Sequence, residues 1–303
     1  MDIKNFENKL KKFKGKIYFN YNLKKLNWFN IGGETKIYFK PDTLQNLIEF
    51  LKLYKKEEKL FVLGAGSNVL FKDDLFEGAV IKLSKNFSRI SLLNENTIIA
   101  GSGALDKMLS EFALENSLSG FEFLSCIPGS IGGGIRMNSG CFEKEFKDIL
   151  LSVQALDNNA KIITIPASKI KFGYRENNLD KNFIFLSASF KGEFKEKKKI
   201  EETMKILKNK KDLVQPTKIK TGGSTFKNPI NQTDKKVWEL IKKSVPLSTK
   251  FGDAEISEKH CNFFVNKNKA SFEEMKKLID YVQEQVKLKT GVTIETEIEI
   301  VNL

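Results

Sequence analysis

Few side chains in this sequence are equipped for chemistry, and their types restrict what that chemistry can be. The chain has one histidine, His260, and three cysteines, Cys126, Cys141 and Cys261, which form no CxxC pair. A multi-histidine metal site is therefore excluded, and a thiolate zinc site and a disulfide framework are both disfavoured. We predict no metal site. Acid–base work then falls to carboxylates, hydroxyls, lysines or a cofactor.

Arginine is scarce. Of 51 basic residues only Arg89, Arg136 and Arg175 are arginine, so lysine supplies the general positive charge. The arginines become candidates for positions that need a rigid, planar and permanently charged group. Arg136 lies in a glycine-rich run and Arg175 in "FGYRENN". An ordinary surface position remains the alternative for each.

Glycine is concentrated in "LGAGSNVLF" and "CIPGSIGGGIRMNSG". Glycine allows close backbone approach, so N–H groups in such loops can converge on an anion. The first loop matches neither a Walker loop nor the G-x-G-x-x-G fingerprint. Each loop alone is compatible with a tight turn, but together they favour a dinucleotide or pyrophosphate site. A third segment, "TKIKTGGSTFKNP" (217–229), contains Ser224; its spacing does not decide between a turn, a phosphate-binding loop and a reacting hydroxyl.

Hydrophobic periodicity indicates the elements that must position these residues. Strands are predicted at 36–40, 60–64, 79–83, 97–100, 151–156, 161–165 and 183–190, and helices at 42–55, 104–116, 194–212, 234–243 and 271–289. Helix starts are predicted at Asp42 or Thr43 and, through a capping box with Glu274, at Ser271, with Gly291 ending the last helix. The mixture lacks regular βαβ units, so we predict an α+β fold, with helix 194–212 connecting two subdomains.

The last segment, "GVTIETEIEIV" (291–301), alternates apolar and polar residues. This pattern predicts a strand with Glu295, Glu297 and Glu299 on one face. A solvated acidic face is the simplest interpretation.

Length and composition indicate a soluble protein of two or three domains, at about 100–200 residues per domain. No apolar run approaches the ~20 residues of a membrane helix, and residues 1–16 lack the apolar core of a signal peptide. We therefore expect a cytoplasmic protein. The net charge of +13 raises nucleic-acid binding as an alternative. The lysines are mixed with acidic residues and accompany no nucleic-acid motif, which favours a solvated surface.

Six segments in order carry a family resemblance: "VLGAGSNVLFKDD", "IPGSIGGGIRMNSGCF", "FGYR", "GGSTFKNP", "GDAEISEKHCNFFVN" and "IETEIEI". From about residue 27 to 301 the chain resembles the UDP-N-acetylenolpyruvoylglucosamine reductases, flavoenzymes of bacterial peptidoglycan synthesis. The length suits the shorter type, which lacks an extra tyrosine-bearing loop. The alternatives are another FAD-dependent oxidoreductase of the same superfamily and a basic nucleotide- or nucleic-acid-binding protein.

The resemblance implies an α+β fold with an FAD-binding region of the vanillyl-alcohol-oxidase (PCMH) type in two subdomains, and a third α+β domain for the substrate. The implied boundaries are 1–83, with strand 292–303 returning to the flavin region, 84–195, and 196–291. The implied partners are the UDP-sugar substrate and NADPH. We expect no nucleic-acid binding, no membrane insertion and a monomeric protein. FAD would be held non-covalently by Gly64, Ala65, Gly66, Ser67, Asn68, Val69, Ile127, Pro128, Gly129, Ser130, Gly132, Gly133, Arg136 and Asn138.

The resemblance also implies the chemistry. NADPH reduces the flavin, hydride passes to the enolpyruvyl group, and the adjacent carbon is protonated. Arg175 and Glu297 would stabilise the enolate and Ser224 would donate the proton, while Tyr174, Lys227 and Asn228 would bind substrate. Alternation alone does not distinguish Glu297 from its neighbours. Asn177 and Asn178 follow Arg175 where the family commonly has serine, so the substrate contact there stays open.

Overall fold

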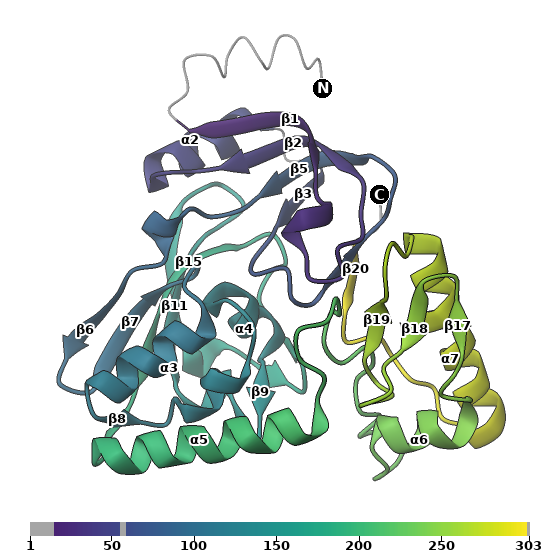
Figure 1. Cartoon of the computed structure of the whole chain (residues 1–303). Coiled ribbons are helices and arrows are strands. Elements are labelled where there is room, and N and C mark those ends of the chain that lie inside the picture. Colours follow the sequence, from purple (N-terminus) through teal and green to yellow (C-terminus); the bar gives the residue numbers. More distant parts are fainter. Residues whose placement is uncertain (1–14, 55–58, 302–303) are drawn as a thin grey trace.

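The computed structural model describes residues 15–54 and 59–301. Residues 1–14 lie outside the described residues, and they make up most of the N-terminal segment in which no signal peptide was predicted. Residues 302–303, the end of the implied strand 292–303, also lie outside them. The described chain forms three sheet-centred units, with the third beside the other two (Figure 1). Helices and mostly antiparallel strands are mixed, which confirms the α+β prediction.

The first unit is a four-stranded sheet with strand order β1-β2-β5-β3. β1 is antiparallel to β2, while β2 and β3 are both parallel to β5. Helix α2 packs Phe50 onto Phe39 of the sheet, with the ring centroids 4.3 Å apart. Thr43 caps α2 by accepting a hydrogen bond from the Asn46 N–H, as predicted. The elements are β1 (Lys16–Asn22), η1 (Lys24–Leu26), β2 (Glu34–Lys40), α2 (Leu44–Leu53), β3 (Lys59–Val62), β4 (Val69–Phe71) and β5 (Phe76–Ile81).

The second unit is a five-stranded antiparallel sheet with strand order β12-β11-β15-β7-β6. Helix α3 buries Leu109 and Ala113, which lie four positions apart and so on one face. Its larger elements are β6 (Ile90–Asn94), β7 (Thr97–Gly101), α3 (Asp106–Glu115), α4 (Ile131–Met137), β11 (Leu150–Leu156), β12 (Ile162–Pro166) and β15 (Ile184–Lys191). The shorter ones are η2 (Lys85–Phe87), β8 (Leu118–Ser119), η3 (Glu122–Cys126), β9 (Gly140–Cys141), β10 (Lys144–Glu145), η4 (Phe146–Asp148), η5 (Ala167–Lys169), β13 (Phe172–Gly173), β14 (Glu176–Asn177) and β16 (Glu193–Phe194).

In the third unit, helix α7 packs against a three-stranded antiparallel sheet, and helix α6 packs against α7. Ser271 and Glu274 form the predicted capping box of α7, and Gly291 ends that helix with φ +74°. The elements are α6 (Val237–Ser244), β17 (Lys250–Phe251), β18 (Ala254–Ile256), β19 (Phe264–Asn266) and α7 (Phe272–Thr290). The core of this unit also takes in Phe29, Ile31 and Leu70 from the first unit. The two units therefore share one apolar cluster.

Helix α5 (Lys197–Val214) runs along the second unit, against α3 and η3, before the chain enters the third unit (Figure 1). Ile200 is buried there, whereas most of the other α5 side chains are exposed. The predicted strands correspond to β2, β3, β5, β7, β11, β12 and β15, and the predicted helices to α2, α3, α5, α6 and α7, with ends shifted by a few residues.

The prediction of one strand over 291–301 is wrong in extent. Only β20 (Glu299–Val301) is a strand, parallel to β4. The residues before it are instead hydrogen-bonded to the third unit, through Lys227 N–H to Glu295 O and Glu297 N–H to Thr225 O. The segment divides its backbone hydrogen bonds between two units, so no single ladder covers its length.

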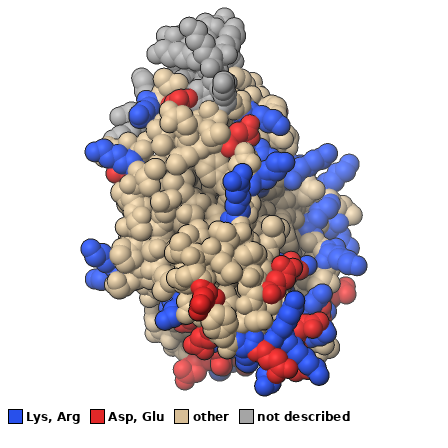
Figure 2. Space-filling model, turned by 90° about the vertical axis from the view of Figure 1, so that its left-hand side faces the viewer, with Lys and Arg blue, Asp and Glu red and all other residues tan. Residues whose placement is uncertain are grey.

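Charged side chains are unevenly distributed on the face shown in Figure 2. Acidic and basic side chains are mixed at the lower end, basic ones predominate along the right-hand edge above it, and a large central area carries few. The basic side chains accompany no nucleic-acid-binding motif in the sequence. In the described ranges, no helix is both long and apolar enough to cross a membrane.

Candidate active site

Three separate motifs meet at residues 294–299, here called the tail segment. Its Glu297 N–H donates to Thr225 O at 2.8 Å, next to Ser224. The Asn68 side chain donates to Glu297 O at 3.0 Å, and Glu299 N–H donates to Asn68 O at 2.9 Å. The tail segment is therefore the piece of chain that connects the first glycine loop (residues 64–69) to the serine segment (222–229).

Arg175 lies at this junction with its guanidinium largely enclosed. Nε donates to Glu297 Oε1 at 3.1 Å, and the two terminal nitrogens approach Gly140 O at 3.2 Å and Asn138 O at 3.5 Å. Only 17% of the side chain is exposed. Its backbone φ of +61° is unusual for a non-glycine residue and marks a strained position. The contacts hold the planar group in one orientation.

Asn138 supports Arg175, whose guanidinium approaches its carbonyl oxygen. It is fully buried, and its side chain donates to Glu145 Oε2 and Gly173 O and accepts from Lys147 N–H. These bonds join helix α4 to the β9–β10 hairpin and to β13. The Asn138 side chain organises the arginine site, and the predicted role of this residue in binding the cofactor stays a prediction.

Glu297 is the one acidic residue of the tail that faces Arg175. Its side chain is 18% exposed, whereas that of Glu295 is 77% exposed. Burial raises the pKa of the Glu297 carboxyl above its usual value, and this is opposed by the charges of Arg175 and Lys227. Low exposure and close contact with Arg175 single out Glu297, which the sequence pattern could not do.

Ser224 forms an isolated antiparallel bridge with Phe263 and is half-buried. Its hydroxyl makes no hydrogen bond to any residue the structure describes. Its neighbour Thr225 bonds directly to Glu297. Ser224 is thus one residue from a backbone hydrogen bond to Glu297, and its hydroxyl has no partner among the described residues.

Tyr174, Lys227 and Asn228 line a hollow of ≈ 290 Å³ next to Arg175. The Asn228 side chain donates to the Tyr174 hydroxyl at 3.2 Å, which links the second and third units. The Tyr174 ring lies 5.0 Å from the Arg175 guanidinium carbon, and Lys227 Nζ lies 4.0 Å from Glu295. The structure therefore brings the three predicted substrate-binding residues together.

The first glycine loop presents unused backbone donors. In the described chain, no backbone N–H of residues 64–68 donates a hydrogen bond. Gly66 has φ +73°, and a Cβ there would lie 2.2 Å from Leu26 O, so only glycine fits. Successive free N–H groups in such a turn suit an anion.

The second glycine loop (residues 127–133) packs against the first. A Cβ on Gly64 would lie 2.5 Å from Ser130 Oγ. The loop is held by Ile131 N–H to Ala104 O and Gly132 N–H to Ser102 O, while the Ser130 hydroxyl is buried without a partner in the described chain. The cradle is preformed, and it contains an unsatisfied polar group.

Arg136 and Asn177 fix the loop that follows Arg175. The Arg136 guanidinium donates to Leu179 O, Asp180 O and Phe183 O and stacks on Phe185, 4.3 Å from the ring centroid. Burial lowers its pKa, opposed by nearby Glu299. Asn177 donates to the carbonyls of Ile135 and Arg136, so this replacement of the usual serine ties the loop to α4. Both side chains have structural contacts here that the sequence did not reveal.

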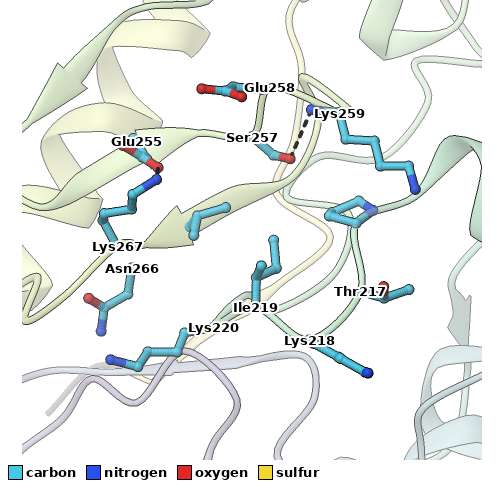
Figure 3. A pocket seen from close by; sticks show the side chains of 12 residues that line it. Thr217, Lys218, Ile219, Lys220, Glu255, Ser257, Glu258, Lys259, Asn266 and Lys267 are labelled. Atoms are coloured by element: carbon cyan, nitrogen blue, oxygen red, sulfur yellow. Dashed lines mark hydrogen bonds and ion pairs between the residues drawn. The ribbon is translucent and has the colours of Figure 1, made fainter.

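A second hollow of ≈ 500 Å³ lies on the third unit, lined by Pro216, Thr217, Lys218, Ile219, Lys220, Glu255, Ser257, Glu258, Lys259, Val265, Asn266 and Lys267 (Figure 3). Lys267 pairs with Glu255 at 3.0 Å and Lys220 donates to Asn268 O. Most of these residues lie in two segments quoted in the sequence analysis, "TKIKTGGSTFKNP" and "GDAEISEKHCNFFVN", but none was given a role there. The hollow shares no residue with the one beside Arg175.

His260 has a local structural contact: Nδ1 accepts from the Asn262 N–H at 3.2 Å. Burial lowers its pKa. Among the described residues, no group of three or more His, Cys, Asp or Glu side chains could hold a metal ion.

Comparison with known proteins decides the family. The chain is 62% identical over 299 residues to the UDP-N-acetylenolpyruvoylglucosamine reductase of Pelagibacter ubique, covering 99% of this chain and 98% of the relative. It is 42% identical over 286 residues to that of Rickettsia conorii, covering 94% and 96%.

The chain belongs to the UDP-N-acetylenolpyruvoylglucosamine reductase family.

Family models and a crystal structure agree with this membership. Residues 35–166 match the model described as "FAD binding domain", and residues 215–301 match "UDP-N-acetylenolpyruvoylglucosamine reductase, C-terminal domain". The crystal structure of the reductase from Thermus caldophilus superposes with a TM-score of 0.81 at 28% identity, covering 95% of this chain and 99% of that one. The PCMH-type flavin fold, the enzyme class and the role in peptidoglycan synthesis predicted from the sequence are confirmed.

This reductase is therefore an FAD-dependent oxidoreductase. The two glycine loops fit the cofactor, because free N–H groups and a tight glycine contact form a cradle suited to a pyrophosphate. Both loops fall within the match to the FAD-binding domain.

The Gly64–Ser130 contact gives a test of the cradle. Gly64→Ala should force the two glycine loops apart, since overpacking of this kind costs about 1–3 kcal/mol, which corresponds to a roughly 5- to 150-fold weaker affinity for FAD. Flavin absorbance per chain after dialysis would report the loss. Adding Ser130→Ala removes the clashing oxygen and should restore binding. Full flavin occupancy in Gly64→Ala would show that the loops do not need this contact.

Proposed function

We propose that this reductase uses NADPH as its reductant and that Arg175, Glu297 and Ser224 are its catalytic residues. The two glycine loops would hold FAD, which would supply the hydride for the terminal carbon of the enolpyruvyl group. The observation that carries the assignment is the Arg175–Glu297 contact at 3.1 Å, one hydrogen bond away from the serine segment.

Arg175 faces the charge that develops on the substrate carboxylate as hydride arrives. Its guanidinium stays ionised and is already oriented by Gly140 O and Glu297, so it needs no rearrangement to stabilise that charge. The raised pKa of Glu297 favours a neutral acid that donates a hydrogen bond to the enolate. Ser224, with a hydroxyl free of partners in the described chain, protonates the adjacent carbon.

The hollow beside Arg175 is the proposed place for the substrate around its reacting group. Tyr174, Lys227 and Asn228 supply a phenol, an ammonium and an amide within it. These groups come from two units that the Tyr174–Asn228 hydrogen bond holds together. Substrate contacts on both sides would thus complete a site that neither unit forms alone.

We propose domain boundaries that modify the sequence-based ones. Residues 1–83 and 84–195 remain the two flavin subdomains. Of the predicted returning strand 292–303, only β20 (Glu299–Val301) joins the first, and the described residues before it bond to the third unit. The third domain was predicted over 196–291, but α5 packs on α3 and η3, and the C-terminal family match begins at residue 215. We place its start after α5. A cytoplasmic location and a monomeric state remain predictions.

A stopped-flow experiment on the two half-reactions tests the proposed function. Flavin bleaching by NADPH and its recovery on adding UDP-N-acetylglucosamine enolpyruvate should both occur within the turnover time. If NADPH bleaches the flavin no faster than NADH does, the assignment of NADPH as the reductant is wrong. If the enolpyruvyl nucleotide does not restore the colour, the substrate assignment is wrong.

The role of Glu297 predicts a pH dependence. If the neutral acid is the active form, the rate of the second half-reaction falls as pH rises through the raised pKa of Glu297, because ionisation removes the donor. Glu297→Gln retains a neutral donor, so the fall in rate at higher pH should be absent from the pH profile of this variant. Exposed Glu295→Gln is the matched control and should keep the native profile. Coincident profiles for the native enzyme and Glu297→Gln would contradict the role.

A further inference from the structure

Two cysteines that the proposed function does not use lie against each other beside the site. Cys126 ends η3, directly before the second glycine loop, and Cys141 lies in β9. Both are free thiols, and the elements that carry them, η3 and β9, pack against each other. Each thiol shifts the pKa of the other. The third thiol, Cys261, lies in the other unit and donates to Trp238 O at 3.2 Å.

The surroundings favour a reactive thiolate in this pair. The hydrogen bond from Cys141 lowers the pKa of Cys126 to about 6, against the effect of burial and with help from the Ser125 hydroxyl and the positive charge of Lys211. Lys211 is held in place by a hydrogen bond from Nζ to Cys126 O at 2.7 Å. The pKa of Cys141 is raised correspondingly, so it keeps its proton. Cys126 is 4% exposed and Cys141 is partly exposed, which leaves the pair within reach of a small oxidant.

We propose that Cys126 and Cys141 are a reversible oxidation site at which hydrogen peroxide forms an intramolecular disulfide that slows the enzyme. The Cys126 thiolate attacks the O–O bond of peroxide, giving a sulfenic acid and hydroxide. The Cys141 sulfur then attacks the sulfenic sulfur; the S–S bond forms, the S–O bond breaks, and the Cys141 proton leaves in water. In sum, two thiols and one peroxide give one disulfide and two waters, and a thiol reductant reverses the reaction.

The β9–β10 hairpin transmits the change to Arg175. Gly140, next to Cys141, accepts a hydrogen bond from Arg175 at 3.2 Å, and Glu145 of the same hairpin lies 3.8 Å from that guanidinium. A disulfide holds its sulfurs about 2 Å apart, closer than two separate thiols can approach. Forming it therefore draws β9 towards η3 and shifts the Arg175 partners. This consequence rests on the proposed role of Arg175, whereas the thiol chemistry does not.

The chemistry is tested on the flavin-loaded enzyme with hydrogen peroxide as the probe. The number of titratable thiols per unfolded chain should fall from three to one, with a mass loss of two hydrogens and a Cys126–Cys141 cross-linked peptide. Dithiothreitol should restore all three thiols. Cys141→Ser should give no cross-link, whereas the control Cys261→Ser should still form it. Oxidation of Cys126 to sulfinic acid without a cross-link in the native enzyme, or a cross-link that joins Cys261 or a second chain in place of Cys126–Cys141, would overturn the proposal.

Kinetics test the consequence separately. In the oxidised enzyme we expect kcat to fall roughly tenfold, since misplacing a catalytic group by about 1 Å can cost as much as 100-fold. The loss should fall on the second half-reaction and be reversed by dithiothreitol. Cys141→Ser should keep its activity in peroxide. A cross-linked enzyme with unchanged kcat would refute the regulatory effect, and a slowed flavin reduction alone would refute its route through Arg175.

Discussion

Replacing Ser224 by alanine is expected to abolish most turnover while leaving flavin reduction by NADPH nearly intact. The hydroxyl has no partner among the described residues and sits one residue from the hydrogen bond that joins the serine segment to Glu297. Removing a proton donor typically costs about 100- to 10,000-fold in the step that uses it. Stopped-flow absorbance would show normal bleaching by NADPH and a slowed return of colour with the enolpyruvyl nucleotide.

The control for this variant is Ser91→Ala, which removes a hydroxyl from an exposed position on β6. It should leave both half-reactions unchanged. If the two half-reactions of Ser224→Ala slowed equally, Ser224 would act in binding or folding and not as the proton donor.

Arg175→Lys is expected to slow the second half-reaction by about 100-fold, a loss comparable to that of one oxyanion donor. The charge is kept, but one ammonium cannot replace three nitrogens directed at Glu297 Oε1, Gly140 O and Asn138 O. Flavin content and NADPH oxidation in the first half-reaction should stay close to native. Single-turnover reoxidation measures the effect directly.

Arg89→Lys is the matched control, since Arg89 is exposed and lies before β6 in the second unit. It should behave as the native enzyme does. Native reoxidation in Arg175→Lys would show that charge alone is sufficient and would refute a role for guanidinium geometry.

Local patterns predicted most of the regular structure. The capping box at Ser271, the stop at Gly291 and the cap at Thr43 are satisfied within a few residues of chain, so the sequence around them is sufficient. Helix α4 was not predicted, because "IGGGIRM" is rich in a poor helix former. It forms because Ile131 and Ile135, four positions apart, are both buried in the core of the second unit.

The sequence by itself indicated the family and the glycine loops, because each motif is a contiguous run of residues and the motifs follow one another in a fixed order. Only the tertiary structure placed Arg175 against Glu297, 122 positions away, and Asn68 against the same residue, 229 positions away. The alternating pattern predicted that Glu295, Glu297 and Glu299 lie on one face of a strand. The tail segment instead passes from the third unit to β4, so that Glu295 is exposed and Glu297 is enclosed. The Cys126–Cys141 contact likewise arises from packing of β9 against η3. Burial and contact between distant residues depend on how the units pack, and no local pattern encodes that.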